Sequence, residues 1–102
     1  MLIERVRAAL ADREGVVEKK MVGGRSFMVG GRLLLGVVGD DLMVRLTGAD
    51  YDEALLEAAT RPMMLGGRAL KNYVLVAPAG VETETQLRAW ISRATAPESG
   101  AR

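Results

Sequence analysis

Pairs of adjacent glycines divide this sequence into short apolar segments, and this feature limits the fold more than any other. The pairs lie at positions 23–24, 30–31 and 66–67, and an arginine follows each one. Glycine tolerates the positive φ angles of tight hairpin turns, so the segments on either side of a pair are expected to run antiparallel. The flanking segments differ from one another, so the pairs predict three similar turns and not a repeat protein. The expected strands are residues 16–22, 26–29, 33–38, 42–47, 63–65 and 73–77.

Two helices are expected before the last pair of strands. The first is amphipathic, with apolar residues at helical spacing from Leu2 to Leu10, and it ends by Gly15. The second is expected to begin at Asp50, whose carboxylate caps the free amides, with Glu53 completing a capping box. Its end is expected at Arg61-Pro62, because the residue before a proline is disfavoured in helical conformation. Its apolar stripe is expected to be Tyr51, Leu55 and Ala58.

The third expected helix completes the element order. It opens with a capping box of Thr83 and Gln86. Its expected buried face is Leu87, Trp90, Ile91 and Ala94. Residues 96–102 have nothing to pack against and are expected to form a disordered tail, which leaves one domain of residues 1–95. The order is helix, three or four strands, helix, two strands, helix. Strands and helices do not alternate, so the sequence predicts an α+β fold with a mostly antiparallel sheet.

Two of the expected strands are apolar on both sides. In residues 33–38 and 73–77 both alternating sets of positions are apolar, so both faces of the central sheet require cover. Three short helices cover one face. Methionine adds adaptable apolar surface to the sheet, at Met21, Met28, Met43, Met63 and Met64. We therefore expect a homodimer through the uncovered face, with a helix that wraps behind the sheet as the alternative.

The chain lacks the residues of a conventional active site. It contains no histidine and no cysteine, which removes the commonest general base, the commonest metal ligand and every thiol nucleophile. The acidic groups at Asp40-Asp41 and at residues 50–53 are assigned to a turn and to a helix N-terminus. The glycines of residues 23–31 lack the Gly-Lys-Ser/Thr ending of a phosphate-binding loop. No catalytic residue, metal or cofactor is therefore expected.

The charges suggest where partners bind. The net charge is only +1, but residues 40–57 are acidic and lie between two basic stretches. Lysine and arginine at hairpin turns can meet an acidic protein surface or a phosphate backbone. The candidate interaction residues are Lys19, Lys20, Arg25, Arg32, Arg68 and Lys71. The N-terminus does not read as a signal peptide and no apolar run approaches the length of a membrane span, so a cytoplasmic protein without membrane contact is expected.

Several motifs, taken together, resemble a known family. They are KKMVGG at 19–24, FMVGGR at 27–32, GVVGD at 36–40, LMVR at 42–45 and GGRALKNYV at 66–74. In this order and spacing they resemble the N-terminal domain of the TfoX/Sxy family of bacterial competence regulators. The resemblance runs from the first helix to about Arg93. It implies the same α+β element order and a role associated with transcriptional control of DNA-uptake genes, without a known catalytic activity.

The sequence departs from the family pattern in two ways. Family members often carry aromatic residues where this chain has Val22, Met43, Met63 and Leu65, so a surface built on those rings is altered. The second, C-terminal domain of the regulators is also missing from the sequence, so we expect a stand-alone N-terminal domain. The expected function is a non-enzymatic protein-interaction module linked to transcriptional regulation, with an unidentified protein partner. The alternatives are a nucleic-acid-binding accessory that binds weakly through its basic turns, and a small-molecule enzyme.

Overall fold

All the strands belong to one antiparallel sheet. The computed structural model describes the backbone of residues 1–21 and 23–100 and the side chains of residues 1–21 and 23–94. The strands are β1 Val16–Met21, β2 Gly24–Val29, β3 Arg32–Val38, β4 Asp41–Arg45, β5 Thr60–Leu65 and β6 Arg68–Val76. Their order across the sheet is β1-β2-β3-β4-β6-β5, and each strand is antiparallel to its neighbours.

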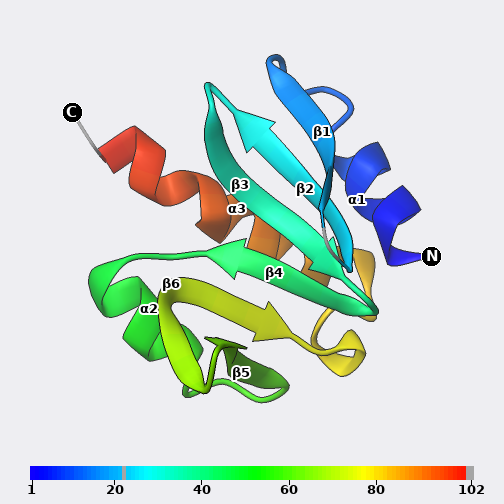
Figure 1. Cartoon of the computed structure of the whole chain (residues 1–102). Coiled ribbons are helices and arrows are strands. Elements are labelled where there is room, and N and C mark those ends of the chain that lie inside the picture. The colour runs from blue at the N-terminus through cyan, green and yellow to red at the C-terminus, as the bar shows by residue number, and fades with distance from the viewer. Residues whose placement is uncertain (22, 101–102) are drawn as a thin grey trace.

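The helices lie on one side of this sheet. They are α1 Leu2–Ala9, α2 Gly48–Ala54, the short 3₁₀-helix η1 Pro78–Gly80 and α3 Glu84–Gly100. Figure 1 shows α3 running behind β3 and β4, with α1 and α2 towards the two edges of the same face. The predicted α+β fold and its element order are confirmed. Within the described residues, no helix combines the length and the apolarity needed to cross a membrane.

Two glycine pairs form the predicted hairpin turns. Gly30 and Gly31 have φ values of 59° and 79°, and Gly66 and Gly67 have 60° and 80°. Two successive positive φ angles are typical of the type I′ turn, whose twist matches that of paired strands. The third pair differs, because only its first glycine has a positive φ and Gly24 is already the first residue of β2.

The prediction for α2 is wrong at both ends. The helix begins at Gly48 with Thr47 at the N-cap position, so Asp50 lies inside the first turn and caps nothing. It ends at Ala54, and Arg61-Pro62 lies within the edge strand β5. The Thr60 hydroxyl lies within hydrogen-bonding distance of the carbonyl oxygens of Ala54 (2.9 Å) and Glu57 (2.8 Å), and its single proton is shared between these two acceptors at the end of the helix. Ala54 is buried as a result, whereas Ala58, predicted to face the core, is exposed.

The prediction for α3 is confirmed where side chains are described. The Thr83 amide donates to Gln86 Oε1 (2.9 Å) and the Gln86 amide donates to Thr83 Oγ1 (3.1 Å), which is the reciprocal pair of a capping box. Leu87, Trp90 and Ala94 are buried, and Ile91 packs half-buried against them. The backbone of α3 continues to Gly100. The side chains of residues 95–102 lie outside the described part of the chain, so the tail expected at 96–102 stays a prediction.

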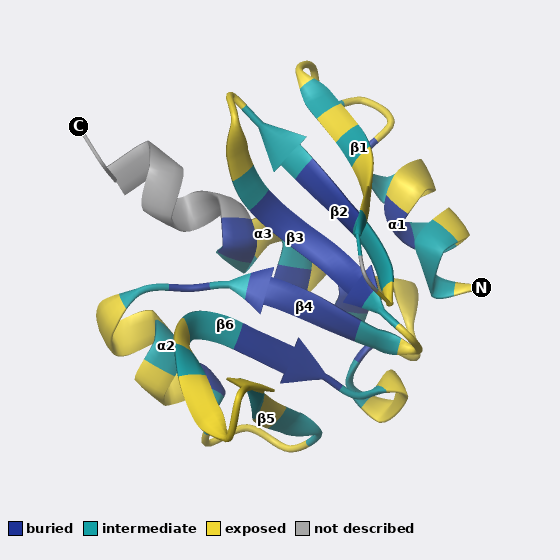
Figure 2. Ribbon diagram, in the orientation of Figure 1, coloured by how far each residue is buried: buried dark blue, intermediate teal, exposed yellow. Residues whose placement is uncertain are grey.

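The core lies between the helices and the central strands, as the buried segments of β3, β4 and β6 in Figure 2 show. A β-bulge in β3 increases the apolar surface on this side. Leu33 pairs with Met28 and Leu35 pairs with Phe27, which leaves Leu34 without a partner on β2. Leu34 and Leu35 both enter the core, so part of the two-sided apolar character of β3 comes from this bulge.

Candidate interaction surface

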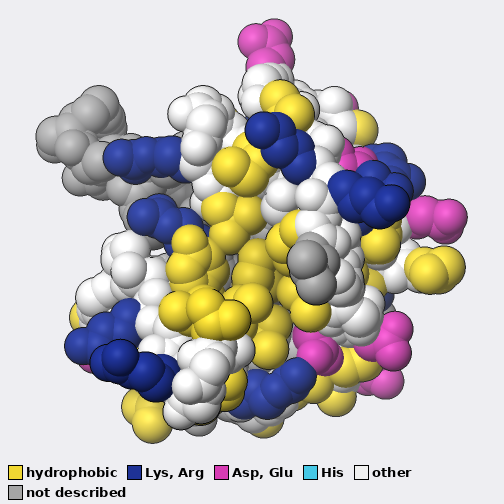
Figure 3. Space-filling model, viewed as in Figure 1, with side chains coloured by type: hydrophobic (Ala, Val, Ile, Leu, Met, Phe, Trp, Pro, Cys, Tyr) yellow, Lys and Arg dark blue, Asp and Glu magenta, His cyan; other side chains and the backbone are white. Residues whose placement is uncertain are grey.

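Within the part of the chain that the structure describes, no helix lies on the other face of the sheet (Figure 1), and we call it the open face. Residues that pair across neighbouring strands point to the same face, so the pairing identifies its members. One row crosses the whole sheet and consists of Lys19, Ser26, Gly36, Met43, Leu75 and Arg61. The middle of this row is small or apolar and each end is a cation. Figure 3 shows the resulting band of hydrophobic side chains across this face, with lysine and arginine around it.

Methionine side chains shape the centre of the open face. A groove of about 240 Å³ lies here, and all its lining residues have largely apolar side chains: Met21, Leu33, Met43, Met63, Leu70 and Tyr73. Gly36 leaves room for this arrangement, since a Cβ there would lie 2.9 Å from the Met43 methyl and 3.3 Å from the Met21 methyl. The two methionines therefore fold over the glycine. Because methionine adapts its shape to its contacts, the groove can accommodate a partner of irregular shape.

Strand β4 places opposite charges on either side of this groove. Asp41, Met43 and Arg45 are alternate residues of one strand and so share the open face. Asp41 forms an ion pair with Arg61 of β5. Arg45 has no ion pair within the residues whose side chains the structure describes. The open face therefore has an unmatched cation at one end of β4.

The six candidate residues from the sequence do not form one surface. Lys19 lies on the open face, whereas Lys20 and Arg25, which pair with each other across β1 and β2, lie on the helix-covered face. Arg32 and Arg68 are the first residues of β3 and β6, and Lys71 follows in β6. Because β3 and β6 both run antiparallel to β4, these three residues lie towards the end of the sheet where Arg45 ends β4. The sequence reasoning missed Arg45 and Arg61, although the alternation Asp-Leu-Met-Val-Arg in β4 is a visible signal.

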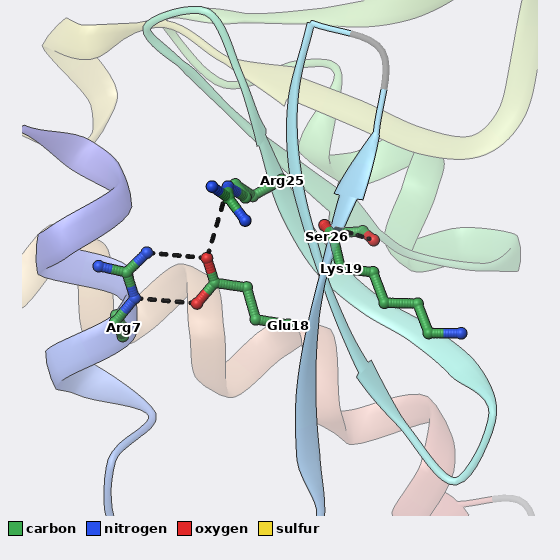
Figure 4. A network of polar contacts seen from close by, with 5 residues as sticks. All are labelled: Arg7, Glu18, Lys19, Arg25 and Ser26. Carbon is green, nitrogen blue, oxygen red and sulfur yellow. Dashed lines mark hydrogen bonds and ion pairs between the residues drawn. The ribbon is translucent and has the colours of Figure 1, made fainter.

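Arg25 on the helix-covered face belongs to an ion network with Glu18 and Arg7 (Figure 4). The Arg7 guanidinium of α1 donates to both carboxylate oxygens of Glu18 in β1, at 2.9 and 2.8 Å. Arg25 of β2 approaches the same carboxylate at 3.6 Å. The hydrogen bonds from Arg7, assisted by the charges of Arg7 and Arg25, hold the pKa of Glu18 below its ordinary value. Glu18 lies between the two arginines, so this network joins α1 to the sheet.

The comparison with protein families agrees with the fold. The model of the TfoX N-terminal domain matches residues 8–97, which is most of the chain. This chain belongs to the TfoX N-terminal domain family. No curated protein and no solved structure gives a significant match. The resemblance inferred from the sequence is therefore confirmed. The open face is a surface of a TfoX N-terminal domain, and its function can be tested there.

Proposed function

We propose that this TfoX N-terminal domain is a non-enzymatic protein-interaction module that binds through the open face of its sheet. The observation that carries the proposal is the groove lined by Met21, Met43 and Met63 in the open face, which none of the described helices covers (Figure 1). Sheet faces in globular domains are normally packed or polar, and a contiguous apolar patch marks an interaction site. The composition supports a binding function, because a chain without histidine or cysteine lacks the usual proton-transfer and thiol groups.

The regulatory part of the proposal comes from the family. As a member of the TfoX N-terminal domain family, the chain is proposed to act in the cytoplasm in connection with transcriptional control. The open face would serve this role without catalysis, since a regulator can act by binding to its partner protein.

Capture of partners from extracts of the native host tests the interaction function. The test variant is Val17→Glu, because Val17 is 53% exposed and lies two residues from Lys19 on the open face, so a charge there should not disturb the core. The control is Thr85→Glu, which adds the same charge at an exposed position in the first turn of α3. We expect proteins retained by the wild type and by the control to be lost from the Val17→Glu domain. Equal retention by all three forms would contradict the proposal.

A second candidate function is nucleic-acid binding, and one specific observation favours it. Arg32, Arg45, Arg68 and Lys71 all lie towards one end of the sheet, where they could meet successive phosphates. The sheet has few aromatic residues for stacking on bases, with Tyr73 the aromatic residue that lines the open-face groove.

A further inference from the structure

We propose that the partner on the open face is a second copy of this chain, docked face to face with the strands of the two copies antiparallel. This inference rests on the proposed interaction function and names its partner. The two copies would be related by a two-fold axis that runs along the cross-strand row containing Met43. In such an isologous contact, every favourable pair occurs twice.

The charges of β4 are complementary to themselves in this arrangement. Asp41 and Arg45 lie at equal spacing on either side of Met43 on the open face. When β4 of one copy lies antiparallel on β4 of the other, each Arg45 faces Asp41 of the opposite copy. The two Met43 positions lie opposite each other on the axis, but each side chain is only 3% exposed, so the ion pairs and not Met43 select the arrangement. The Asp41 carboxylate already accepts from Arg61, and its two oxygens have the capacity to accept from a second arginine. A parallel arrangement would instead place arginine on arginine, so the charges select the antiparallel one.

The charges around the open face favour the same orientation. Arg32, Arg68 and Lys71 lie towards the Arg45 end of the sheet, and Asp40 lies beside Asp41 at the opposite end. The two-fold axis brings the Arg45 end of each copy over the Asp40-Asp41 end of the other. The row on the axis ends in Lys19 and Arg61, so each of these cations would face its own copy at the margin of the contact. Lys19 lies on the edge strand β1 and can keep its ammonium group in solvent, and Arg61 on the edge strand β5 keeps its ion pair with Asp41.

The area of the open face indicates a weak dimer. Six strands about 4.8 Å apart, each contributing about five residues at about 3.3 Å per residue, give a face of roughly 500 Å². Two copies would bury roughly 1,000 Å² in total before side-chain relief is counted, which is typical of weak interfaces, since stable ones bury about 1,200 to 2,000 Å². Met21 and Met63 line the groove half-buried, and methionine can repack to fill the space between two sheets.

A charge-exchange experiment tests the orientation as well as the dimer. Sedimentation equilibrium of the wild-type chain at about 100 µM should give the mass of a dimer. The single variants Arg45→Asp and Asp41→Arg should each raise the dissociation constant roughly tenfold or more, because each places like charges opposite one another. An equimolar mixture of the two variants should form a heterodimer of nearly wild-type affinity, since both like-charge contacts become ion pairs again.

Two controls keep the outcomes distinct. Lys20→Glu changes a charge on the helix-covered face and should leave the dimer unchanged. Circular dichroism of each variant identifies any loss of folding, and recovery in the mixture cannot come from unfolded chains. A wild-type mass of one chain at this concentration, or a mixture no tighter than the separate variants, would overturn the proposal. A monomer whose captured partners are still lost with Val17→Glu would overturn only the dimer, whereas a dimer unaffected by Val17→Glu would contradict the proposed use of the open face itself.

Discussion

Gly24 shows how one residue can require glycine without forming a turn. Its φ is not positive, yet a Cβ built on it would lie 1.7 Å from the Val37 carbonyl oxygen of the neighbouring strand. A backbone oxygen of a central strand cannot move aside cheaply. We therefore expect Gly24→Ala to lower the free energy of unfolding by about 3 kcal/mol, near the upper end of the range for overpacking. Urea denaturation followed by circular dichroism measures this change.

The control for this substitution is Gly30→Ala. Gly30 has a positive φ of 59° and nothing within 4 Å of its built Cβ, so alanine there adds backbone strain without a collision. The expected loss is about 1–2 kcal/mol, the cost of a left-handed conformation for an L-residue. Equal losses at the two positions would contradict the close-approach explanation for Gly24.

The Glu18 network predicts a pH dependence of stability. Because Arg7 holds the pKa of Glu18 below its ordinary value of 4.5, the ionised carboxylate is stabilised in the folded state relative to the unfolded state. This contribution is fully present above the unfolded pKa and is lost as the pH falls through the folded pKa. Glu18→Gln should therefore destabilise the domain near about pH 7, and its difference from the wild type should shrink as the pH falls from about 5 to 3.

Unfolding in urea across this pH range checks the effect, with Glu84→Gln as the matched control. Glu84 pairs with Arg88 one helical turn away, and both side chains are about 60% exposed, so this exposed pair is expected to contribute little at any pH. A difference between Glu18→Gln and wild type that grows as the solution is acidified would contradict the assignment.

At the scale of elements, α3 depends on its N-terminal capping box. Thr83 Oγ1 accepts a hydrogen bond from the backbone amide of Gln86. Thr47, at the N-cap position of α2, makes no side-chain cap hydrogen bond. We expect Thr83→Ala to lower the free energy of unfolding by about 1 kcal/mol, the usual value of an N-cap hydrogen bond, and Thr47→Ala to cost clearly less. Thermal and urea unfolding of the two variants compare them directly. A larger loss at Thr47 would mean that the cap of α3 is not the stabilising feature.

The elements that the sequence predicts well are those with local signals. Hairpins at Gly30-Gly31 and Gly66-Gly67 and the cap at Thr83 depend on residues within one turn, and the structure contains all three. The end of α2 depends on the Thr60 hydroxyl reaching back to Ala54, a contact that no residue pattern around Pro62 reveals. Pro62 itself is tolerated because β5 is an edge strand.

The candidate surface was harder to predict than the fold, because it too depends on contacts that are not local in the sequence. Which face a residue occupies depends on strand register, and a shift of one residue reverses every side chain. Lys19 and Lys20 are adjacent in sequence and lie on opposite faces, so a set chosen by proximity to turns mixes the two. The methionine content and the doubly apolar strands did indicate an uncovered face. The bulge at Leu34, however, directs part of that apolar surface into the core.

At the scale of the whole molecule, four cations gather towards one end of the sheet. Arg32, Arg45, Arg68 and Lys71 lie towards one end, and Asp40 and Asp41 lie at the other. The acidic start of α2 follows Arg45 within five residues, so Asp50 and its neighbours lie near the basic end as well. This proximity limits how strongly these cations can attract a polyanion.

The last prediction therefore concerns nucleic acid, for which we expect weak binding without sequence preference. With about three phosphate contacts at the basic end, a log–log slope near 0.9 per contact lowers the affinity roughly fortyfold between about 50 and 200 mM salt. Fluorescence anisotropy of a labelled duplex at both salt concentrations measures this loss. Arg68→Ala combined with Lys71→Ala should remove most of the binding, whereas Lys20→Ala combined with Arg25→Ala, on the helix-covered face, should remove less. Submicromolar, sequence-dependent affinity at the higher salt concentration would favour the nucleic-acid function over the protein-interaction module. Such affinity requires contacts to the bases, which the phosphate contacts proposed here do not supply.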